Sequence, residues 1–187
     1  MKQIFLFFAI FSAVLSVGEG QRFRRTCPNV NTKADFNITA YEGDWYEQKR
    51  FPAIFELGLT CVKANYLLLQ NGDIRVTNSG INRLFRTPSV SVGRATVPDP
   101  AEPGRLSVSF GGNGSGPYLI LATDYKDYAL VYSCQSYFNL FAVEFAWILR
   151  RDNSQQLQSD LRSRLYSILL KYDIQPSRFL DVYNPTC

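Results

Sequence analysis

Apolar and polar residues alternate along most of this chain with a period of two, the spacing of side chains on one face of a β-strand. Turn-forming residues interrupt the alternation about every 8 to 12 residues, which is typical of an antiparallel sandwich or barrel. The strongest turn, Asn71-Gly72-Asp73, tolerates the positive φ of a tight hairpin. It joins a strand predicted over 61–68 to a returning strand over 74–78. One face of the returning strand holds Ile74, Val76 and Asn78.

Six other segments complete the predicted sheet. One begins at Trp45, and the others cover residues 89–97, 106–110, 118–122, 128–134 and 141–149. The last three are apolar on both faces in places, so we expect them to be more covered than the earlier strands. Eight strands are about the number that closes into a barrel able to hold one small ligand. The chain is therefore predicted to be all-β.

The period changes after Arg151. Apolar residues then recur at steps of three and four, which predicts an amphipathic helix. Its stripe consists of Leu157, Leu161, Leu165, Ile168, Leu169 and Tyr172. Asp152 or Ser154 is the expected N-cap, and Gln175-Pro176 lies beyond the end of the helix. We expect this one C-terminal helix to pack on the outside of the barrel.

Residues 1–20 have the organisation of a secretory signal peptide. Lys2 supplies a positive charge, residues 4–17 are almost entirely apolar, and Gly18-Glu19-Gly20 offers small residues for cleavage. The apolar run is short for a membrane span. We therefore expect a secreted, extracellular protein whose remaining residues, 21–187, form one domain with a hydrophobic core of its own.

The net charge of +4 is small and spread along the chain. A nucleic-acid-binding protein usually gathers its cations on one face, so we predict no nucleic-acid partner. The densest basic run is Arg22-Phe23-Arg24-Arg25, for which a disordered N-terminal arm is the expected structure.

Four cysteines in a secreted chain indicate two disulfides, and their spacing leaves all three pairings open. The chain contains no histidine, which removes imidazole-ligated zinc sites, Ser-His-Asp triads and the commonest general base. We predict no metal site. Two sequons, Asn37-Ile38-Thr39 and Asn113-Gly114-Ser115, predict N-glycans on surface loops at Asn37 and Asn113.

A small secreted enzyme that uses paired carboxylates is the alternative from a different functional class. Asp124 and Asp127 are the nearest acidic pair. Asp124 stands in a Thr-Asp-Tyr turn, however, where turn hydrogen bonds explain an aspartate better than catalysis does. We therefore predict no enzymatic activity. A structural or signalling protein with an empty cavity stays open as a further alternative.

Two distant segments are suited to meet in space. Gly43-Asp44-Trp45-Tyr46 opens the first strand, and the run 147–151 ends on Arg150 and Arg151. A guanidinium laid over an indole gains about 0.5–2 kcal/mol, and this contact would join the first strand of a closed barrel to the last. The other interpretation is that Trp45 is an ordinary core residue and that the arginines are solvated.

Three short motifs in this order resemble the signature of the lipocalins. They are Gly43-Asp44-Trp45 near the first strand, Thr123-Asp124-Tyr125 between the sixth and seventh, and Arg151 after the eighth. Residues 122–134 and 145–149 further resemble the branch of that family that includes apolipoprotein D and bilin-binding proteins, as do Cys27-Pro28, Trp45-Tyr46-Glu47 and Ala64-Asn65-Tyr66. The likeness covers nearly all of residues 21–187.

The resemblance implies an eight-stranded antiparallel up-and-down barrel, a calyx that is open at one end. In this family the motif arginine, here Arg151, lies across the motif tryptophan, here Trp45, and closes the other end. The resemblance also implies two disulfide pairings, Cys27–Cys134 and Cys61–Cys187.

Function would then lie in the cavity, because a mostly apolar pocket with a few polar groups binds a small hydrophobic molecule. By resemblance its ligand-binding residues are Tyr66, Asn78, Tyr118 and Trp147, and we expect Phe110 to join them. Leu119 replaces a tryptophan of that branch, and the glycine-rich run 111–116 replaces a longer loop, so the ligand stays open. A lipid, fatty acid or sterol is the first choice and a bound bilin (biliverdin) or carotenoid the second, with no cofactor required.

Two predicted loops are unusually apolar for segments that face water. Residues 51–59 connect the first two strands, and residues 137–141 connect the seventh and eighth. If both lie at the open end, they form an exposed rim that contacts a membrane, a lipoprotein particle or a hydrophobic protein. The equal alternative is that their side chains fold into the mouth and cap the cavity.

Overall fold

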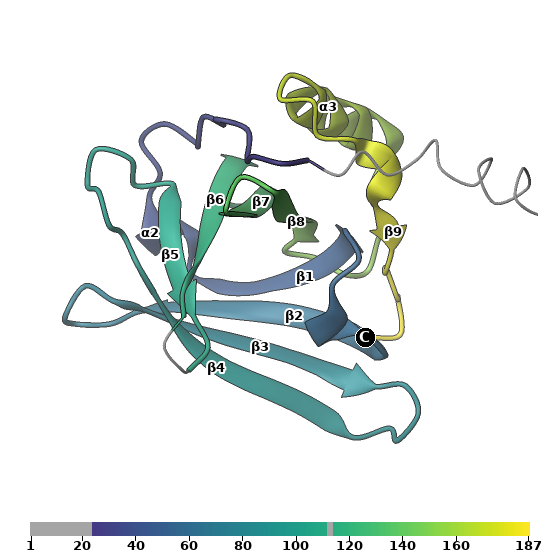
Figure 1. The fold of residues 1–187 in the computed structure, drawn as a ribbon. Coiled ribbons are helices and arrows are strands. Elements are labelled where there is room, and N and C mark those ends of the chain that lie inside the picture. Colours follow the sequence, from purple (N-terminus) through teal and green to yellow (C-terminus); the bar gives the residue numbers. More distant parts are fainter. Residues whose placement is uncertain (1–23, 112–113) are drawn as a thin grey trace, which may run out of the picture.

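A computed structural model describes residues 24–111 and 114–187 (Figure 1). The predicted signal peptide, 1–20, and the sequon residue Asn113 lie outside these residues. One nine-stranded sheet runs in the order β2-β3-β4-β5-β6-β7-β8-β1-β9, and an additional pairing of β2 with β1 closes it into a barrel. Every ladder is antiparallel. The predicted fold, an eight-stranded barrel with one C-terminal helix outside, is confirmed, and β9 is an addition to it.

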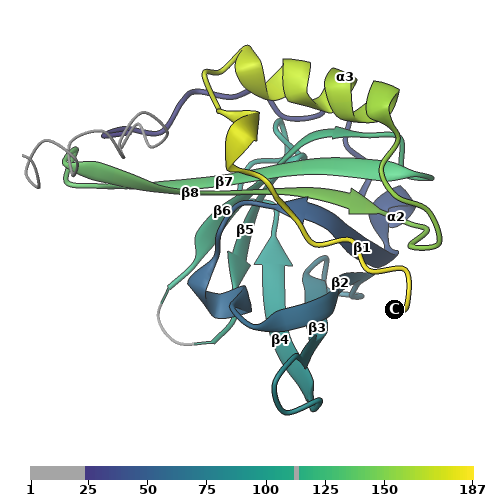
Figure 2. The same cartoon turned by 90° about the vertical axis from the view of Figure 1, so that its right-hand side faces the viewer.

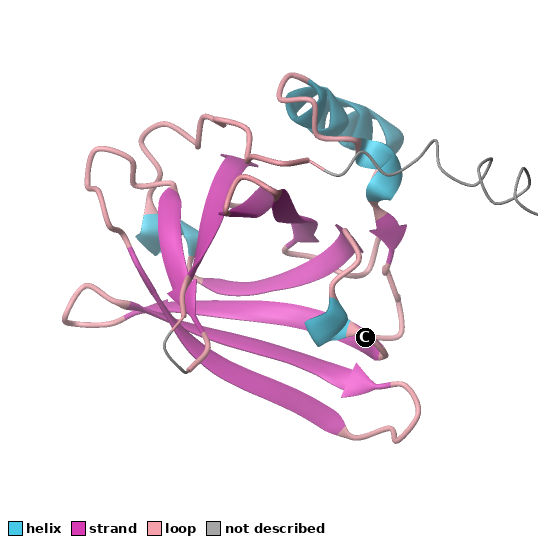
Figure 3. Ribbon diagram, viewed as in Figure 1, coloured by secondary structure: helices cyan, strands magenta, loops and turns pink. Residues whose placement is uncertain are grey.

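The strands are β1 (Gly43–Arg50), β2 (Leu59–Leu68), β3 (Ile74–Asn82), β4 (Pro88–Thr96), β5 (Arg105–Ser109), β6 (Gly116–Thr123), β7 (Tyr128–Tyr137), β8 (Phe141–Arg150) and β9 (Leu180–Asp181). The α-helices are α2 (Ile38–Tyr41) and α3 (Ser159–Leu170), and the 3₁₀ turns are η1 (Ile54–Glu56) and η2 (Pro176–Arg178). Figure 3 shows these helical segments around the outside of the strands. The predicted hairpin turn lies between β2 and β3, where Gly72 has a φ of +84°.

A β-bulge in β1 decides which side chains face the barrel interior. Glu47 pairs with Leu149 of β8, but the next pair is Lys49 with Ile148, so Gln48 is an extra residue. A bulge of this kind lets residues three apart point to the same side of a sheet. Glu47 and Arg50 therefore both face inward. Strict alternation from Trp45 would instead place Arg50 outside.

The outward side chain of Gln48 ties β1 to the segment before α3. Its amide nitrogen donates a hydrogen bond to Asn153 Oδ1 at 3.2 Å, and its amide oxygen accepts one from the backbone nitrogen of Leu157 at 3.0 Å. The backbone oxygen of Gln48 also accepts from Val182, just after β9, at 3.0 Å. One extra residue thus anchors two segments of the C-terminal region.

The apolar residues form two cores, one on each side of the β7–β8 wall. Val131 belongs to the interior core, whereas Leu130 and Tyr132, its neighbours in β7, belong to a core between the wall and α3. Leu165 and Leu169 of α3 are fully buried in this outer core, and burying a leucine contributes about 1.5–3 kcal/mol. Figure 2 shows α3 lying along the outside of β7 and β8.

The predicted N-cap of the C-terminal helix is wrong. The helix begins at Ser159, its N-cap position is Gln158, and no side chain caps it. The Asp152 carboxylate instead accepts hydrogen bonds from the backbone nitrogen and the hydroxyl of Ser154, both at 2.7 Å. Both candidate caps are therefore used in a turn directly after β8.

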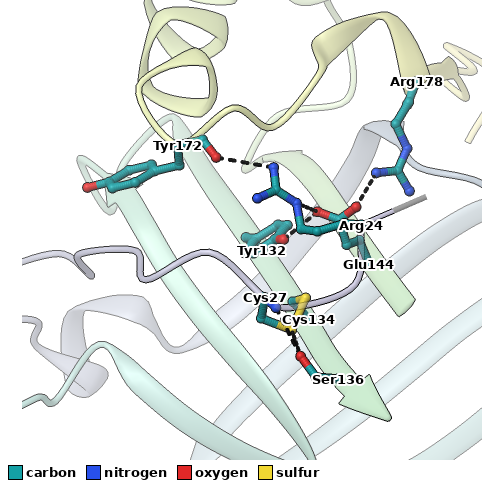
Figure 4. Close-up of a disulfide and its surroundings, with 8 residues drawn as sticks. All are labelled: Arg24, Cys27, Tyr132, Cys134, Ser136, Glu144, Tyr172 and Arg178. Atoms are coloured by element: carbon teal, nitrogen blue, oxygen red, sulfur yellow. Dashed lines mark hydrogen bonds and ion pairs between the residues drawn. A yellow bond between two sulfur atoms is a disulfide. The ribbon is translucent and has the colours of Figure 1, made fainter. Parts of the chain in front are cut away.

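The segment before β1 is held against the barrel by a disulfide and by an ion-pair cluster (Figure 4). Cys27 is bonded to Cys134 of β7, with Cα atoms 5.7 Å apart. Nearby, the buried carboxylate of Glu144 pairs with Arg24 at 3.5 Å and with Arg178 at 2.7 Å. Arg24, which the sequence placed in a disordered arm, is thus docked against β8, and that expectation is wrong at this residue.

The second disulfide and β9 cover the seam where β1 and β2 separate. The two strands pair only as far as Tyr46 and Lys63. Beyond this point β9 pairs with β1 at Lys49 and Arg50. Cys187 is bonded to Cys61 of β2, with Cα atoms 5.3 Å apart. The C-terminal tail therefore completes the wall on the side of the open end.

Candidate functional site: a cavity closed at one end

One end of the barrel is closed by Arg151 over Trp45. Trp45 is fully buried, and the guanidinium carbon of Arg151 lies 3.9 Å from the centroid of its ring. The Arg151 nitrogens donate hydrogen bonds to the backbone oxygens of Asp44 at 2.9 Å, Tyr125 at 3.0 Å and Ala40 at 3.2 Å. One side chain thus joins α2, β1 and the β6–β7 turn.

Gly43 makes room for this contact. Its φ is +94°, a left-handed conformation that side chains rarely adopt, and an added Cβ would lie 3.2 Å from Arg151 Nη1. Just before it, Asn37 caps α2 by accepting a hydrogen bond from the Ala40 backbone nitrogen at 3.1 Å. Asn37 is exposed, and its predicted N-glycan stays a prediction.

The Thr123-Asp124-Tyr125 motif builds the turn beneath the closed end. One Asp124 oxygen accepts hydrogen bonds from the backbone nitrogens of residues 126, 127 and 128 at 2.8–3.2 Å. Thr123 Oγ1 donates to the Tyr128 backbone oxygen at 2.7 Å and accepts from the Tyr125 nitrogen at 2.9 Å. Asp127, the other member of the acidic pair, forms an ion pair with Arg150 at 2.5 Å. Both carboxylates therefore have structural roles.

Above the closed end lies a cavity of about 440 Å³. All five predicted ligand-binding residues line it: Tyr66, Asn78, Phe110, Tyr118 and Trp147. Phe110 is half-exposed at 46% and so belongs to its outer part. The remaining lining residues are Glu47, Phe55, Glu56, Leu59, Val62, Ala64, Val76, Ser79, Gly80, Ser89, Ser91, Val108, Gly116, Pro117, Ser133, Phe145 and Leu149. The wall is mainly apolar and aromatic, with few polar groups.

Hydroxyl and aromatic groups form the inner part of the wall. Tyr66 donates a hydrogen bond to the Tyr118 hydroxyl at 2.5 Å, and the Tyr118 ring lies 6.1 Å from that of Trp147. Tyr41 stacks on Trp45 at 4.8 Å and contacts Tyr66 at 5.1 Å. Burial raises the pKa of all three tyrosines, so their phenols stay neutral.

Asn78 carries an unmet hydrogen-bonding group on the cavity wall. Its Oδ1 is buried, and none of the described residues supplies it with a donor. Leaving a buried acceptor unpaired costs about 1–3 kcal/mol. A ligand with a hydroxyl or amide donor would remove this cost.

Two buried carboxylates and one arginine form a cluster that the sequence pattern did not predict. Arg50 Nη1 donates to Glu47 Oε2 at 3.0 Å, Arg50 Nε lies 3.1 Å from Glu56 Oε2, and Arg50 Nη2 donates to the Glu56 backbone oxygen at 3.0 Å. Trp147 Nε1 donates to Glu56 Oε1 at 3.3 Å. Burial, followed by the nearby Glu56 charge, raises the pKa of Glu47 to about 8. Burial also raises the pKa of Glu56.

The apolar loops at the open end are largely exposed rather than folded into the mouth. Ile54 in the β1–β2 loop and Phe138 in the β7–β8 loop are each 91% exposed, and the β3–β4 loop adds Leu84 at 82%. Phe55 is 62% exposed and also lines the cavity, where it packs on Phe145 at 5.1 Å. Phe51, which the sequence placed in the same rim, is buried against Phe179 on the outer side of the barrel. The exposed side chains of the three loops are Ile54, Phe55, Leu57, Leu84, Phe85, Tyr137, Phe138, Leu140 and Phe141.

Within residues 24–111 and 114–187, no group of three or more acidic or cysteine side chains is placed to hold a metal ion. In the same part of the chain, no helix has the length and apolar character needed to cross a membrane.

Comparison with known proteins gives close relatives along the whole chain. A family profile described as "Lipocalin-like domain" matches residues 36–175. Apolipoprotein D of Macaca fascicularis is 36% identical over 189 residues, covering 100% of this chain and 98% of the relative. Apolipoprotein D of Mus musculus is 40% identical over 154 residues, covering 81% and 80%. The solved structure of insecticyanin from the tobacco hornworm Manduca sexta matches with a TM-score of 0.71 and 25% identity, over 86% of this chain and 87% of that one.

Proposed function

The chain belongs to the lipocalin family, and from this premise we propose that it is a secreted carrier of one small hydrophobic ligand, a lipid, fatty acid or sterol. The observation that carries the proposal is the cavity of about 440 Å³ with its mainly apolar, aromatic wall. Sites of about 300–1,000 Å³ with a few placed polar groups are typical of small-molecule binding. Tyr66, Asn78, Phe110, Tyr118 and Trp147 are the proposed ligand contacts.

Ligand titration followed by tryptophan fluorescence tests this proposal. Trp147 lines the cavity whereas Trp45 is sealed under Arg151, so an apolar ligand should quench the Trp147 emission saturably. Retinoids, arachidonate, progesterone and biliverdin are suitable probes. Trp147→Phe should remove most of the quenching. Absence of binding by every probe, in protein shown to be folded by circular dichroism, would refute the proposal.

A matched pair of variants on β5 checks that binding occurs inside the barrel. Val108 lines the cavity, whereas Ser107 points to the opposite face of the same strand. Val108→Phe should fill part of the cavity and weaken ligand binding about tenfold, which corresponds to about 1.4 kcal/mol. Ser107→Phe should leave affinity unchanged. Equal effects of the two substitutions would place the ligand elsewhere.

A bound pigment, either a bilin or a carotenoid, is the second candidate within the same class. The tyrosine-rich wall suits a conjugated ligand, since aromatic faces pack well on flat rings. A visible absorption band in purified protein, or saturable binding of biliverdin alone, would favour the pigment. No catalytic role is proposed, because Asp124 and Asp127 are engaged in the turn and in an ion pair.

We further propose that the exposed apolar rim contacts a membrane, a lipoprotein particle or a hydrophobic protein. Its loops follow β1, β3 and β7, which run in the same direction in an antiparallel barrel, so they share the open end. Flotation with phosphatidylcholine liposomes tests membrane contact, and Phe138→Ser should reduce it. Protein that stays at the bottom of the gradient would argue against membrane contact.

Secretion is the final part of the proposal. The signal-like residues 1–20 and the two disulfides support it, because such bonds persist in oxidising compartments. Expression of the tagged chain in cultured cells should deliver protein that begins at Gln21 to the medium. A glycosidase that removes N-glycans should lower its mass if Asn37 or Asn113 is modified. Retention of the full-length chain in the cell would contradict secretion.

A further inference from the structure

The charged groups on the cavity wall are all acidic. Glu47 and Glu56 line the cavity, and no lysine or arginine does so among residues 24–111 and 114–187. Both glutamates are more than nine-tenths buried, at 8% and 6% exposure. Charged side chains are rarely buried unless they are paired, so this pair of carboxyl groups requires an explanation.

One guanidinium is shared between the two carboxyl groups. Arg50 contacts Glu47 at 3.0 Å and Glu56 at 3.1 Å, and its third nitrogen is used by a backbone oxygen. The β1 bulge holds Glu47 and Arg50 on the same face, and η1 brings Glu56 to them. Arg50 Nε and Glu56 Oε2 form a close ion pair without a hydrogen bond between them, so the one guanidinium is shared by both acids.

The other groups around this cluster supply no positive charge. Tyr66 on β2 and Tyr118 on β6 are neutral phenols, and Trp147 on β8 donates its only N–H to Glu56. Glu47 Oε1, by contrast, receives no hydrogen bond from any described residue, although Glu47 lines the cavity. The Glu47 carboxyl group therefore keeps a free hydrogen-bonding position at a residue that lines the cavity.

A ligand carboxylate would be the third acid at a site with one cation. Taking an ion out of water is unfavourable unless an opposite charge compensates it. Even with Glu47 protonated, such a ligand would add a second negative charge beside Glu56 at a site with one cation, Arg50. A neutral ligand with a hydroxyl, ketone or amide head needs no extra charge and can bond to Glu47 Oε1.

We propose that Glu47 and Glu56 determine specificity, so that the cavity prefers neutral apolar ligands with a hydrogen-bonding head over carboxylates with the same hydrocarbon. This inference rests on the proposed carrier function and narrows its ligand class. The raised pKa of Glu47 agrees with it, because a protonated carboxyl can donate to a ketone or hydroxyl oxygen at neutral pH.

The test compares two ligands that differ only in the head group. Retinol and retinoate have the same polyene, and their affinities for the intact protein are measured at neutral pH by tryptophan quenching and calorimetry. Retinol should bind about tenfold or more tightly than retinoate. Equal affinities, or tighter binding of retinoate, would overturn the inference alone. Binding of neither compound by folded protein would overturn the carrier function and this inference with it.

Charge-neutral variants locate the effect. Glu56→Gln removes the acid next to a Glu47 that holds a proton at neutral pH, and it should raise retinoate affinity several-fold there with little change for retinol. Glu47→Gln imitates the protonated carboxyl, so it should raise retinoate affinity only at about pH 9, where Glu47 of the unchanged protein is ionised. Glu102→Gln, at an exposed position outside the cavity, is the control with the same change in net charge and should alter neither affinity. A ratio of the two affinities that is unchanged in both cavity variants would overturn the assignment to Glu47 and Glu56.

Discussion

Replacement of Arg151 by methionine tests how much the closed end contributes to the stability of the barrel. Methionine keeps the length and the apolar stem of the side chain but removes the guanidinium over Trp45. Three backbone oxygens, on Ala40, Asp44 and Tyr125, then lose their donor. Each net hydrogen bond is worth about 1 kcal/mol where water has partial access, and the cation–π contact adds about 0.5–2 kcal/mol. The expected loss in free energy of unfolding is therefore about 3.5–5 kcal/mol.

Urea unfolding with intact disulfides, followed by tryptophan fluorescence and circular dichroism, measures this loss. The slope of the free energy of unfolding against urea concentration should be the same in the variant, since the surface exposed on unfolding does not change. Arg75→Met is the matched control, because Arg75 is exposed on β3 and its side chain makes no hydrogen bond to a described residue. Its effect should stay within about 0.5 kcal/mol. Arg151→Lys should fall between the two, because it retains a cation with fewer donors. A loss for Arg151→Met no larger than that for Arg75→Met would refute the reasoning.

Three further predictions concern packing, charge and cross-linking. Gly93→Ala should lower the free energy of unfolding by about 1–3 kcal/mol, because the added Cβ would lie 2.5 Å from a backbone oxygen of β5. Gly116→Ala is the control, because its added Cβ would meet nothing within 4 Å. Equal urea midpoints for the two variants would contradict the prediction. The pKa of Glu47 is raised from 4.5 to about 8 in the folded protein, so the folded state holds a proton in that window and stability falls as pH rises through it. Urea unfolding is measured near pH 4.5 and above pH 8, the two pKa values of Glu47. The free energy of unfolding of Glu47→Gln should rise relative to that of the unchanged protein as pH rises, and a constant difference between the two proteins would disprove this. Replacing Cys61 and Cys187 by alanine should cost up to about 4.7 kcal/mol of chain entropy, which calorimetry would record as a lower Tm; an unchanged Tm would count against the model of unfolded-state restriction.

The strands and hairpins of this barrel were predictable because local rules decide them. Period-two alternation and Asn71-Gly72-Asp73 depend on neighbouring residues alone, and β2 and β3 lie close to the predicted ranges. The strand β9 has only two residues, too short for any period to reveal. The start of α3 was misplaced because Asp152 and Ser154 bond to each other, an arrangement that composition does not separate from a helix cap.

Which side chains point into the barrel was harder to predict than where the strands lie. In β4 the serines, Ser89 and Ser91, line the cavity, whereas Val90 and Val92 are about 60% exposed on the outside. This reverses the usual rule that apolar residues point inward. Alternation shows which residues share a face, but not which face of the strand points into the barrel. Four of the five predicted ligand contacts came from family resemblance and Phe110 was added to them, and all five line the cavity.

The buried acids escaped prediction for a physical reason. Glutamate normally remains in water, so Glu47 and Glu56 read as exposed positions until Arg50 is known to face them. Arg50 faces them only because of the β1 bulge, and no residue in the run Glu47-Gln48-Lys49-Arg50 predicts a bulge. A charged residue three positions after an inward-facing acid is the only signal in the sequence, and it is a weak one.

The bulge at Gln48 also separates the residues of β1 that face the barrel interior from the residue that holds the C-terminal region. Because the extra residue points outward, Arg50 faces inward together with Trp45 and Glu47, which a regular strand would not allow. Gln48 meanwhile binds the backbone of Leu157 and the side chain of Asn153. In this one strand, the inward positions face the barrel interior, and a different, outward position attaches the C-terminal region. In protein engineering, the inner set can be redesigned for new ligands while the outer connection is left as it is.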